Sequence, residues 1–397
     1  MTNSAGLMFS AEQDLPATRH ICFLTGTRAD FGKLKPLIVG ASELPGIRVT
    51  VLVTGMHLMP KYGSTVNEVR RLEPGVHIRE FDNQSEGDSM DRILARTIEG
   101  LAELIDEDRP DLIVVHGDRV EALGGAAGGA LRNVAVAHVE GGELSGTIDG
   151  VLRHAVSKLS HIHLVANEES KRRVVQLGED SATVWAIGSP DIDVMLSDSL
   201  PSLGEVLSDY EIPFDSYALV ILHGVTTEDV QTNAAVASGM IDALIKRDGN
   251  AVIVHPNNDP GSEVILDAYE RLDGDERFRV FPSLRFEAFL TLLRHAEMLI
   301  GNSSAGIREA PIYGVPSVDI GSRQRGRADH PSIIHSGISA AEVAAAMTVA
   351  EGMQRAEPSL QFGTGDSAER FCALLAGNEI WARGVDKVFQ DLLISED

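Results

Sequence analysis

Three acidic residues follow apolar segments in the first half of the chain. Asp118 comes shortly after the apolar run 112–115, and Glu140 directly follows the run 134–139. Asp149 ends the glycine-containing segment after Glu140. If these runs are neighbouring strands, the three carboxyl groups converge, and each raises the pKa of the others. Because such a cluster is unfavourable unless a reaction needs it, the pattern predicts a proton-transfer site.

Residues suited to binding an anion follow other apolar runs. Arg28 lies in a glycine-containing turn directly after the run 21–24. A turn between a strand and a helix can cradle a phosphate, and arginine adds a fork of donors. The turn lacks the Gly-x-Gly-x-x-Gly fingerprint, so NAD is not indicated. A plain turn with a surface arginine is the alternative.

The second half of the chain repeats this arrangement. Ser303 and Ser304 occupy the position of a helix N-cap, where hydroxyl and N–H groups can hold a diphosphate. Glu309 can accept hydrogen bonds from ribose hydroxyls. Arg323, in a segment with three arginines, can neutralise phosphate charge, and His223 can contact a phosphate or sugar hydroxyl. Ordinary capping, a solvated charge run and a structural histidine are the alternatives.

A metal site is not expected. His161 and His163, with His138 and His154 nearby, lack the spacing of known zinc motifs. We expect His163 to be buried and hydrogen-bonded. Protein donors can hold a diphosphate, so we predict no metal and no other cofactor.

The overall composition excludes several classes of protein. The 397 residues include 59 acidic and 34 basic side chains, a formal charge of −25, which argues against nucleic-acid binding. No apolar run approaches the roughly 20 residues of a membrane span. Residues 1–18 lack the pattern of a secretory signal. The two cysteines provide no disulfide framework, which favours a cytoplasmic location.

Apolar runs alternate with amphipathic segments almost throughout, which predicts doubly wound α/β domains. The runs are continuous, as expected for parallel strands covered on both faces. We expect strands at 21–24, 49–53, 112–115, 134–139, 163–166, 184–187, 218–222, 251–255, 278–281, 298–300 and 317–320. Residues 188–203 are rich in proline and serine and are interpreted as a linker.

Four parts of the chain follow from this pattern. We predict a flexible tail at 1–18, a Rossmann-like domain with the acidic residues at 19–195, and a second Rossmann-like domain at 205–375. Residues 376–397 are predicted to form a helix. Two such domains imply a cleft that faces the carboxyl ends of both sheets.

These segments together resemble the UDP-N-acetylglucosamine 2-epimerase family, and more narrowly its hydrolysing branch, which supplies N-acetylmannosamine for sialic acid synthesis. The matching segments occur in order between about residues 21 and 327. The strongest matches are at 25–37, 53–57, 116–123, 138–149, 153–167, 256–259, 301–311 and 320–327.

The resemblance implies a GT-B-type fold, a UDP-sugar between two Rossmann-like domains, and a C-terminal helix that returns to the first domain. It assigns acid–base work to Asp118, Glu140 and Asp149. It places six residues around UDP, and we add Arg153 to the substrate-binding candidates. The six are Arg28, His223, Ser303, Ser304, Glu309 and Arg323. A homodimer or homotetramer is expected, because oligomers are common in the family.

The chain departs from the family pattern at two positions. Gly150 stands where a second aspartate usually follows Asp149, and Gly224 stands where the family usually has proline. Neither change removes a candidate residue. Gly150 can alter the sugar pocket or loosen the segment that carries Asp149.

Four other functions stay open. The substrate can instead be UDP-N,N′-diacetylbacillosamine, on the legionaminic acid route, or the enzyme can be a non-hydrolysing epimerase that keeps UDP attached. The segment Gly-Thr-Arg-Ala-Asp-Phe-Gly favours the hydrolysing branch. A GT-B glycosyltransferase would need an acceptor site. A nucleotide-sugar-binding protein without turnover would not need three clustered acids.

Overall fold

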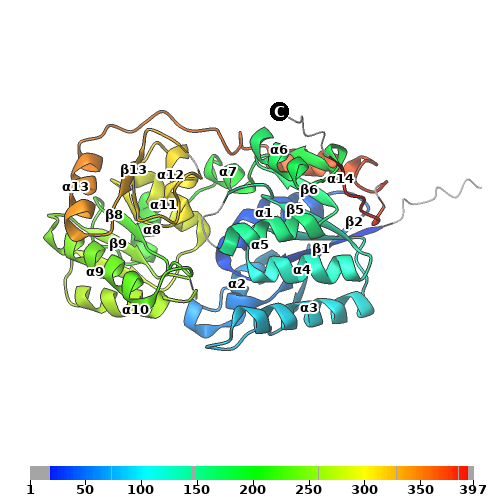
Figure 1. The fold of residues 1–397 in the computed structure, drawn as a ribbon, viewed down its shortest axis with the longest axis horizontal. Coiled ribbons are helices and arrows are strands. Elements are labelled where there is room, and N and C mark those ends of the chain that lie inside the picture. The colour runs from blue at the N-terminus through cyan, green and yellow to red at the C-terminus, as the bar shows by residue number, and fades with distance from the viewer. Residues whose placement is uncertain are drawn as a thin grey trace, which may run out of the picture.

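The computed structural model describes residues 18–72, 74–144, 148–257, 259–327, 329–382 and 384–391. Within them the chain forms two parallel β-sheets, each belonging to one α/β domain (Figure 1). The predicted fold class, two Rossmann-like doubly wound domains facing a central cleft, is confirmed. The predicted tail at 1–18 lies, apart from Thr18, outside the described residues.

The N-terminal domain contains a sheet in the order β3-β2-β1-β4-β5-β6-β7. All its neighbouring strands are parallel, and Ile21 of β1 pairs with both Val49 and Leu112. The order reverses between β1 and β4. The strands are β1 Arg19–Thr25, β2 Ile47–Val53, β3 His77–Glu80, β4 Leu112–His116, β5 Ala135–Val139, β6 Ile162–Val165 and β7 Val184–Ala186.

The C-terminal domain repeats this topology with the order β10-β9-β8-β11-β12-β13. Here the order reverses between β8 and β11, and the strands are again parallel. The strands are β8 Ala218–Ile221, β9 Ala251–Val254, β10 Phe278–Phe281, β11 Leu299–Gly301, β12 Ser317–Ile320 and β13 Ile333–Ser336.

Helices connect the strands and cover both sheets. Those of the first domain are α1 Arg28–Ser42, α2 Val66–Val69, α3 Met90–Glu107, α4 Val120–Leu131, α5 Ile148–Leu159 and α6 Glu168–Gln176. The later helices are α7 Pro190–Met195, α8 Leu203–Asp209, α9 Val230–Lys246, α10 Ser262–Tyr269, α11 Phe286–His295, α12 Glu309–Ile312, α13 Ala340–Glu351 and α14 Ser367–Ala376. None of the helices in the described residues is long and apolar enough to span a bilayer.

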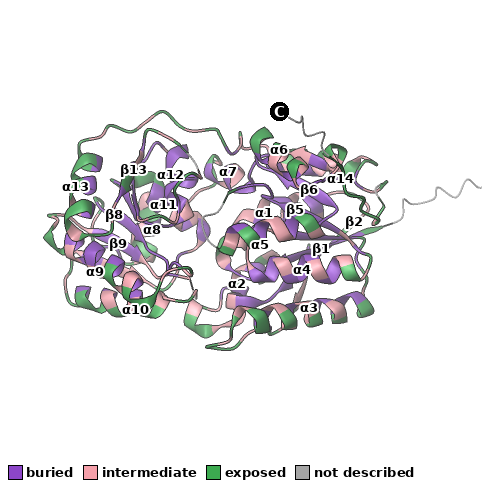
Figure 2. Ribbon diagram, viewed as in Figure 1, coloured by how far each residue is buried: buried purple, intermediate pink, exposed green. Residues whose placement is uncertain are grey.

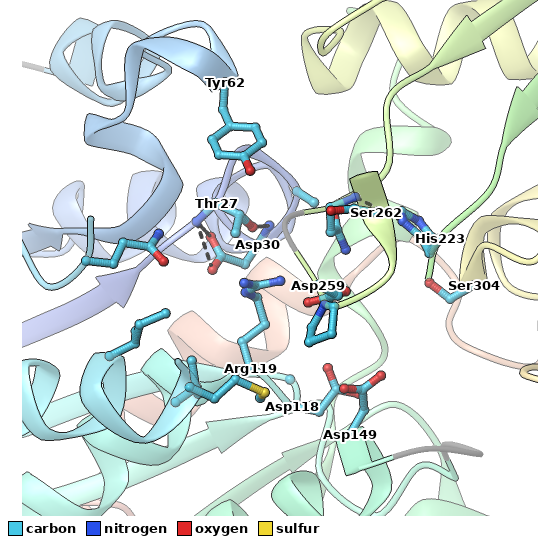
Figure 3. A pocket seen from close by; sticks show the side chains of 18 of the residues that line it. Thr27, Asp30, Tyr62, Asp118, Arg119, Asp149, His223, Asp259, Ser262 and Ser304 are labelled. Atoms are coloured by element: carbon cyan, nitrogen blue, oxygen red, sulfur yellow. Dashed lines mark hydrogen bonds between the residues drawn. The ribbon is translucent and has the colours of Figure 1, made fainter. Parts of the chain in front are cut away.

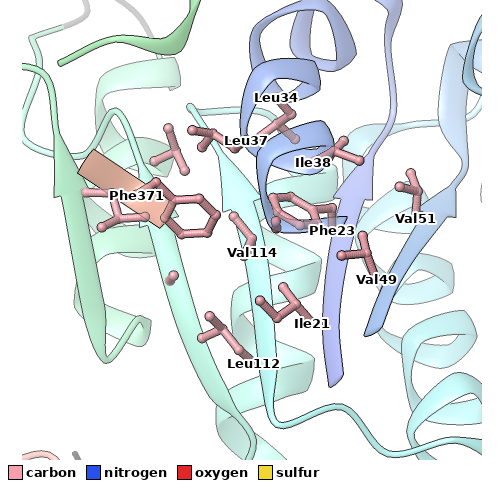
Figure 4. Close-up of a cluster of buried hydrophobic side chains, with 14 of the residues drawn as sticks. Ile21, Phe23, Leu34, Leu37, Ile38, Val49, Val51, Leu112, Val114 and Phe371 are labelled. Atoms are coloured by element: carbon pink, nitrogen blue, oxygen red, sulfur yellow. The ribbon is translucent and has the colours of Figure 1, made fainter. Parts of the chain in front are cut away.

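Alternating side chains of each strand pack into different cores, which is why the strand sequences are apolar throughout. In β1, Ile21 and Phe23 contribute to one core with α1 and α14 (Figure 4). Cys22 and Leu24 belong to the core on the opposite face, with α3 and α4. The strands are therefore buried and the outer helix faces are exposed (Figure 2).

Two predictions need correction. The expected linker at 188–203 contains helix α7, which packs on α1 and α11. Its apolar side chains Ile192 and Met195 are buried, and this packing outweighs the proline–serine composition. A helix was expected at 376–397, but the last helix of the described residues, α14, already ends at Ala376. Residues 377–382 and 384–391 form turns, bends and irregular chain.

The chain returns to the N-terminal domain through α14. A long connection after α13 crosses between the domains and leads to this helix (Figure 1). Phe371 of α14 is fully buried, and its ring meets that of Phe23 edge-on at 6.2 Å between centroids. Residues 367–375, predicted as part of the second domain, therefore belong to the core of the first.

Candidate active site

The two domains enclose a cleft at the carboxyl ends of their strands, beside the positions where the strand order reverses. Open α/β sheets bind ligands at such positions, because loops diverge there to opposite faces. The cleft contains a cavity of about 560 Å³ that continues into a second one of about 230 Å³. Thr27, Lys33, His223 and Ser304 line both.

The three predicted acid–base residues all line the larger cavity. Asp118 follows β4, Glu140 follows β5, and Asp149 lies in the first turn of α5. Figure 3 shows Asp118 and Asp149 side by side beneath Arg119. The structure therefore brings together three carboxyl groups from separate segments, as the sequence indicated.

Glu140 is the most buried of the three, with 2% of its surface exposed. Its Oε2 lies 3.0 Å from His116 Nε2, and its Oε1 lies 2.7 Å from Arg308 Nη2. Burial favours the neutral acid, but Arg308, Lys33 and His116 outweigh burial and hold the pKa of Glu140 well below its usual range. Glu140 is thus ionised at neutral pH.

The backbone of Glu140 is held in an unusual conformation, with a φ of 63° in the left-handed region. Non-glycine residues adopt this conformation at a cost of order 1–3 kcal/mol, mainly at functional sites. The backbone N–H of Glu140 donates to the Leu164 carbonyl at 2.9 Å. Its own carbonyl accepts from Arg153 Nη1 at 2.7 Å. These bonds turn the side chain toward the cleft.

Asp118 is fixed from two directions. Arg153, predicted as a substrate-binding residue, is buried and donates through Nη2 to the Asp118 carboxylate. His138 Nε2 donates to the carbonyl of Gly117 at 2.8 Å, and its Nδ1 accepts from the Ser157 hydroxyl at 2.9 Å. His138 thus orders the turn that carries Asp118.

Asp149 and Arg323 approach each other across the cleft, with Oδ2 and Nη2 3.5 Å apart. Arg323 also donates to the Asn302 carbonyl at 3.1 Å. Gly150, one of the two departures from the family pattern, is buried within α5, so Asp149 lies in a helical turn rather than in a loose loop. The residues 145–147 just before this helix lie outside the described residues.

The smaller cavity is lined by five of the predicted UDP-binding residues and by apolar side chains. The apolar walls include Leu284, Phe286 and Phe289, which suit a planar base. The five residues are Arg28, His223, Ser303, Ser304 and Glu309. Arg28 extends across the domain boundary and donates to Ser283 Oγ at 2.5 Å.

His223 is a neutral hydrogen-bond donor in this cavity. Burial, followed by Arg323 and Arg119, lowers its pKa to about 3. Its Nδ1 accepts from the backbone N–H of Asn257 at 3.1 Å, so the proton of the neutral ring is on Nε2. Gly224 beside it has little room for a side chain, since a Cβ would come 2.4 Å from the Pro260 carbonyl oxygen.

The first turn does not offer the expected backbone cradle. The N–H groups of Gly26 and Thr27 already donate to the Asp30 carboxylate, at 3.1 and 3.2 Å. Asp30 also completes a capping box with Thr27 at the start of α1. An internal carboxylate thus occupies the position in which an anion was expected. Arg28 supplies charge from its side chain instead.

The second predicted anion site also differs from expectation. Ser303 and Ser304 were expected at the N-cap of a helix, but the chain forms a 3₁₀ turn, Ser304–Gly306, and then the short helix α12. Ser303 uses its hydroxyl to accept from the backbone N–H of Ala305. Glu309 is the first residue of α12, and one of its oxygens lies 3.2 Å from Lys33 Nζ.

Four further residues were not singled out from the sequence: Lys33, His116 and Arg308, which line the larger cavity, and Asp191, which is buried beside them. Lys33 Nζ lies 3.0 Å from Asp191 Oδ2 and 3.9 Å from Glu140 Oε1. Lys33, His116 and Arg308 stand inside the matched segments, beside residues that were selected. Asp191 had no such signal, because it lies in the segment interpreted as a linker.

Buried histidines that stay neutral in the folded state should make the free energy of unfolding depend on pH. Burial lowers the pKa of His57 to about 4, from 6.5 in an exposed chain. Only the unfolded state then binds this proton between about pH 6.5 and 4, so stability is lost as pH falls through this window. We expect each such histidine to add up to about 1.4 kcal/mol per pH unit to the fall in unfolding free energy.

Urea denaturation at pH 7.5, 6.5 and 5.5 measures this dependence. The two ring nitrogens of His57 are hydrogen-bonded to the hydroxyls of Thr25 and Thr65, at 3.0 and 2.6 Å. The variant His57→Gln is therefore less stable, but its free energy of unfolding is expected to fall less steeply with decreasing pH. Parallel curves for the two proteins would show that His57 is not held neutral.

Comparison with known proteins places the chain among nucleotide-sugar enzymes. Residues 41–376 match the family model described as UDP-N-acetylglucosamine 2-epimerase. The UDP-N-acetylglucosamine 2-epimerase of Neisseria meningitidis serogroup B is 46% identical over 94% of this chain and 99% of that protein. The UDP-N,N′-diacetylbacillosamine 2-epimerase (hydrolyzing) of Legionella pneumophila is 29% identical over 90% of this chain and 95% of that protein.

A solved structure shares the fold at much lower sequence identity. A UDP-GlcNAc 2-epimerase from Neisseria meningitidis bound to UDP-GlcNAc superimposes with a TM-score of 0.74. It is 18% identical and covers 90% of this chain and 99% of that chain. At this identity the likeness establishes the two-domain architecture alone.

Proposed function

The chain belongs to the UDP-N-acetylglucosamine 2-epimerase family, and from this premise we propose that it is a hydrolysing member, which converts UDP-N-acetylglucosamine and water to N-acetylmannosamine and UDP. One observation carries the proposal. Three carboxylates line a cavity that continues into a second one with apolar walls and diphosphate donors. The family resemblance connects this product with sialic acid synthesis.

The reaction explains why several carboxyl groups are needed. The C2 proton of an acetamido sugar is too weakly acidic for simple removal. It can leave if the C1–O bond to UDP breaks in the same elimination, which yields 2-acetamidoglucal and UDP. Water then adds to C1, and a proton returns to C2 on the opposite face. One carboxylate must accept the first proton and another acid must supply the last.

The residues of the cleft fit these steps. Asp118, Glu140 and Asp149 lie where the sugar must sit if UDP occupies the smaller cavity. Arg28, neutral His223 and Ser304 can donate to the departing diphosphate, which needs its developing charge stabilised. Arg323 lies beside Asp149, so it can neutralise charge on the diphosphate and also orient the Asp149 carboxylate.

Sequence similarity supports N-acetylglucosamine as the sugar. The identity of 46% to a UDP-N-acetylglucosamine 2-epimerase exceeds the 29% to a diacetylbacillosamine enzyme. Diacetylbacillosamine differs from N-acetylglucosamine only in its substituents at C4 and C6. UDP-N,N′-diacetylbacillosamine is therefore the specific alternative substrate. We further propose a cytoplasmic homo-oligomer, and light scattering of the purified protein tests the oligomeric state.

Proton NMR with UDP-N-acetylglucosamine in D₂O tests the proposed function. We expect free N-acetylmannosamine with deuterium at C2, together with UDP, because the returning proton comes from solvent through an acidic group. Equilibration with UDP-N-acetylmannosamine would instead place the chain in the non-hydrolysing branch. If neither product forms and UDP-N,N′-diacetylbacillosamine is hydrolysed, the proposed substrate is wrong.

A further inference from the structure

Arg308 crosses from the C-terminal domain into a group of buried carboxylates in the N-terminal domain. Its Nη2 lies 2.7 Å from Glu140 Oε1 and 2.6 Å from Ser189 Oγ, while its Nη1 donates to Glu143. Only 3% of the residue is exposed. The guanidinium fork therefore connects the two domains through Glu140 itself.

The position of Arg308 in the chain also connects this contact with the smaller cavity. Arg308 lies between Ser304 and Glu309, both of which line the smaller cavity. The segment from Ser303 to Glu309 therefore faces the proposed diphosphate site on one side and Glu140 on the other. A shift of this segment would change both sites at once.

Arg308 provides the shortest contact between Glu140 and a residue of the second domain. Lys33 belongs to the same domain as Glu140, and its Nζ lies 3.9 Å from Glu140 Oε1. A carboxylate as buried as Glu140 favours its neutral form unless cations and donors compensate. The other charged or titratable groups around it are Lys33, His116, Glu143, Arg153, Asp191 and Glu309.

The carboxylates in this group outnumber the cations that pair with them. Asp191 is fully buried, and its Oδ2 lies 3.7 Å from Arg308 Nη2. Glu143 pairs with Nη1, the other terminal nitrogen of the guanidinium group. Withdrawal of Arg308 would leave Lys33 and Arg153 as the remaining permanent cations near four carboxylates, those of Glu140, Glu143, Asp191 and Glu309. The charge on Glu140 then becomes unfavourable.

We propose that Arg308 is the positioning residue for Glu140: it holds this carboxylate ionised and oriented in the larger cavity only while the two domains are closed. The role rests on the proposed function, since it concerns the acid–base group of that reaction. Through Arg308, the segment that binds the diphosphate controls whether Glu140 can accept a proton. Elimination is thereby restricted to a cleft in which UDP is already held.

The pH dependence of the Arg308→Gln variant tests this role. In the wild type, Glu140 stays ionised, so no loss of kcat due to its protonation is expected above about pH 5. In Arg308→Gln, burial raises the pKa of Glu140, and kcat falls as pH decreases. We expect the ratio of wild-type to variant kcat to increase as pH falls from 8.5 to 5.5, by up to about tenfold for each pH unit below the raised pKa, the limit for a single protonation.

Two matched variants separate positioning from folding. Arg308→Lys restores the charge but not the fork, so its pH profile should return to that of the wild type while kcat stays low. Arg247→Gln removes another arginine, which is partly buried, pairs with Glu297 and Glu351, and lines neither cavity. It should leave the pH profile unchanged. The inference is wrong if the ratio for Arg308→Gln is constant with pH, or if Arg247→Gln changes in the same way.

A measurement without substrate keeps this inference separate from the proposed function. In protein labelled with ¹³C at the glutamate carboxyl, the Glu140 resonance is identified by its absence in Glu140→Gln. It should titrate at higher pH in Arg308→Gln than in the wild type. If the wild type fails to convert UDP-N-acetylglucosamine, the proposed function is wrong, and this titration still decides the role of Arg308. An unchanged titration would overturn it.

Discussion

Glu140→Gln is expected to lower kcat with UDP-N-acetylglucosamine by about 10²–10⁴-fold, the usual contribution of a general acid–base group. Glutamine keeps the shape of the side chain but can neither accept nor return a proton. Asp118→Asn and Asp149→Asn are expected to have effects in the same range, because the reaction needs proton transfer at more than one step. Initial rates of UDP release measure all three.

The products released by each variant show which step it has lost. A variant that cannot remove the C2 proton forms no glucal, whereas one that cannot complete hydration releases 2-acetamidoglucal with UDP. Glu168→Gln is the control, since Glu168 is exposed and lies outside the cleft. If all three cleft variants kept nearly wild-type turnover, the acid–base assignment would be wrong.

Much of this site could be predicted because it depends on where strands end. Continuous apolar runs locate buried parallel strands, and the residue types just after them locate the cleft. Asp118, Glu140, His223 and Ser303 were found in this way. Strands β3 and β13 were missed, since both lie at sheet edges and carry exposed polar residues such as His77.

The parts that could not be predicted depend on contacts between distant segments. The sequence around Arg308 does not reveal that its partners, Glu140 and Glu143, lie in the other domain. Similarly, the role of Asp30 becomes visible only once its carboxylate is seen on the N–H groups of the first turn. Local propensity carries no information about which charges meet across a domain boundary.

Asp191 is the sharpest example of such a contact, and its removal should destabilise the protein. The side chain is fully buried and pairs with Lys33 Nζ at 3.0 Å. Burial raises the pKa of Asp191, but Lys33 and Arg308 outweigh burial and lower it, so at neutral pH the residue is charged. Asp191→Ala leaves these cations less compensated, and we expect about 3–5 kcal/mol less unfolding free energy.

Urea denaturation at pH 7.5 measures this loss, with Asp198→Ala as the matched control, because Asp198 is exposed on the same segment. Since the pKa of Asp191 is lowered on folding, its stabilisation is complete above the ordinary aspartate pKa of 3.8 and disappears as pH falls below it. The difference between wild type and Asp191→Ala should therefore shrink in acid. A loss below about 1 kcal/mol at pH 7.5, the size expected of an exposed ion pair, would mean that this group of charges does not hold the two domains together.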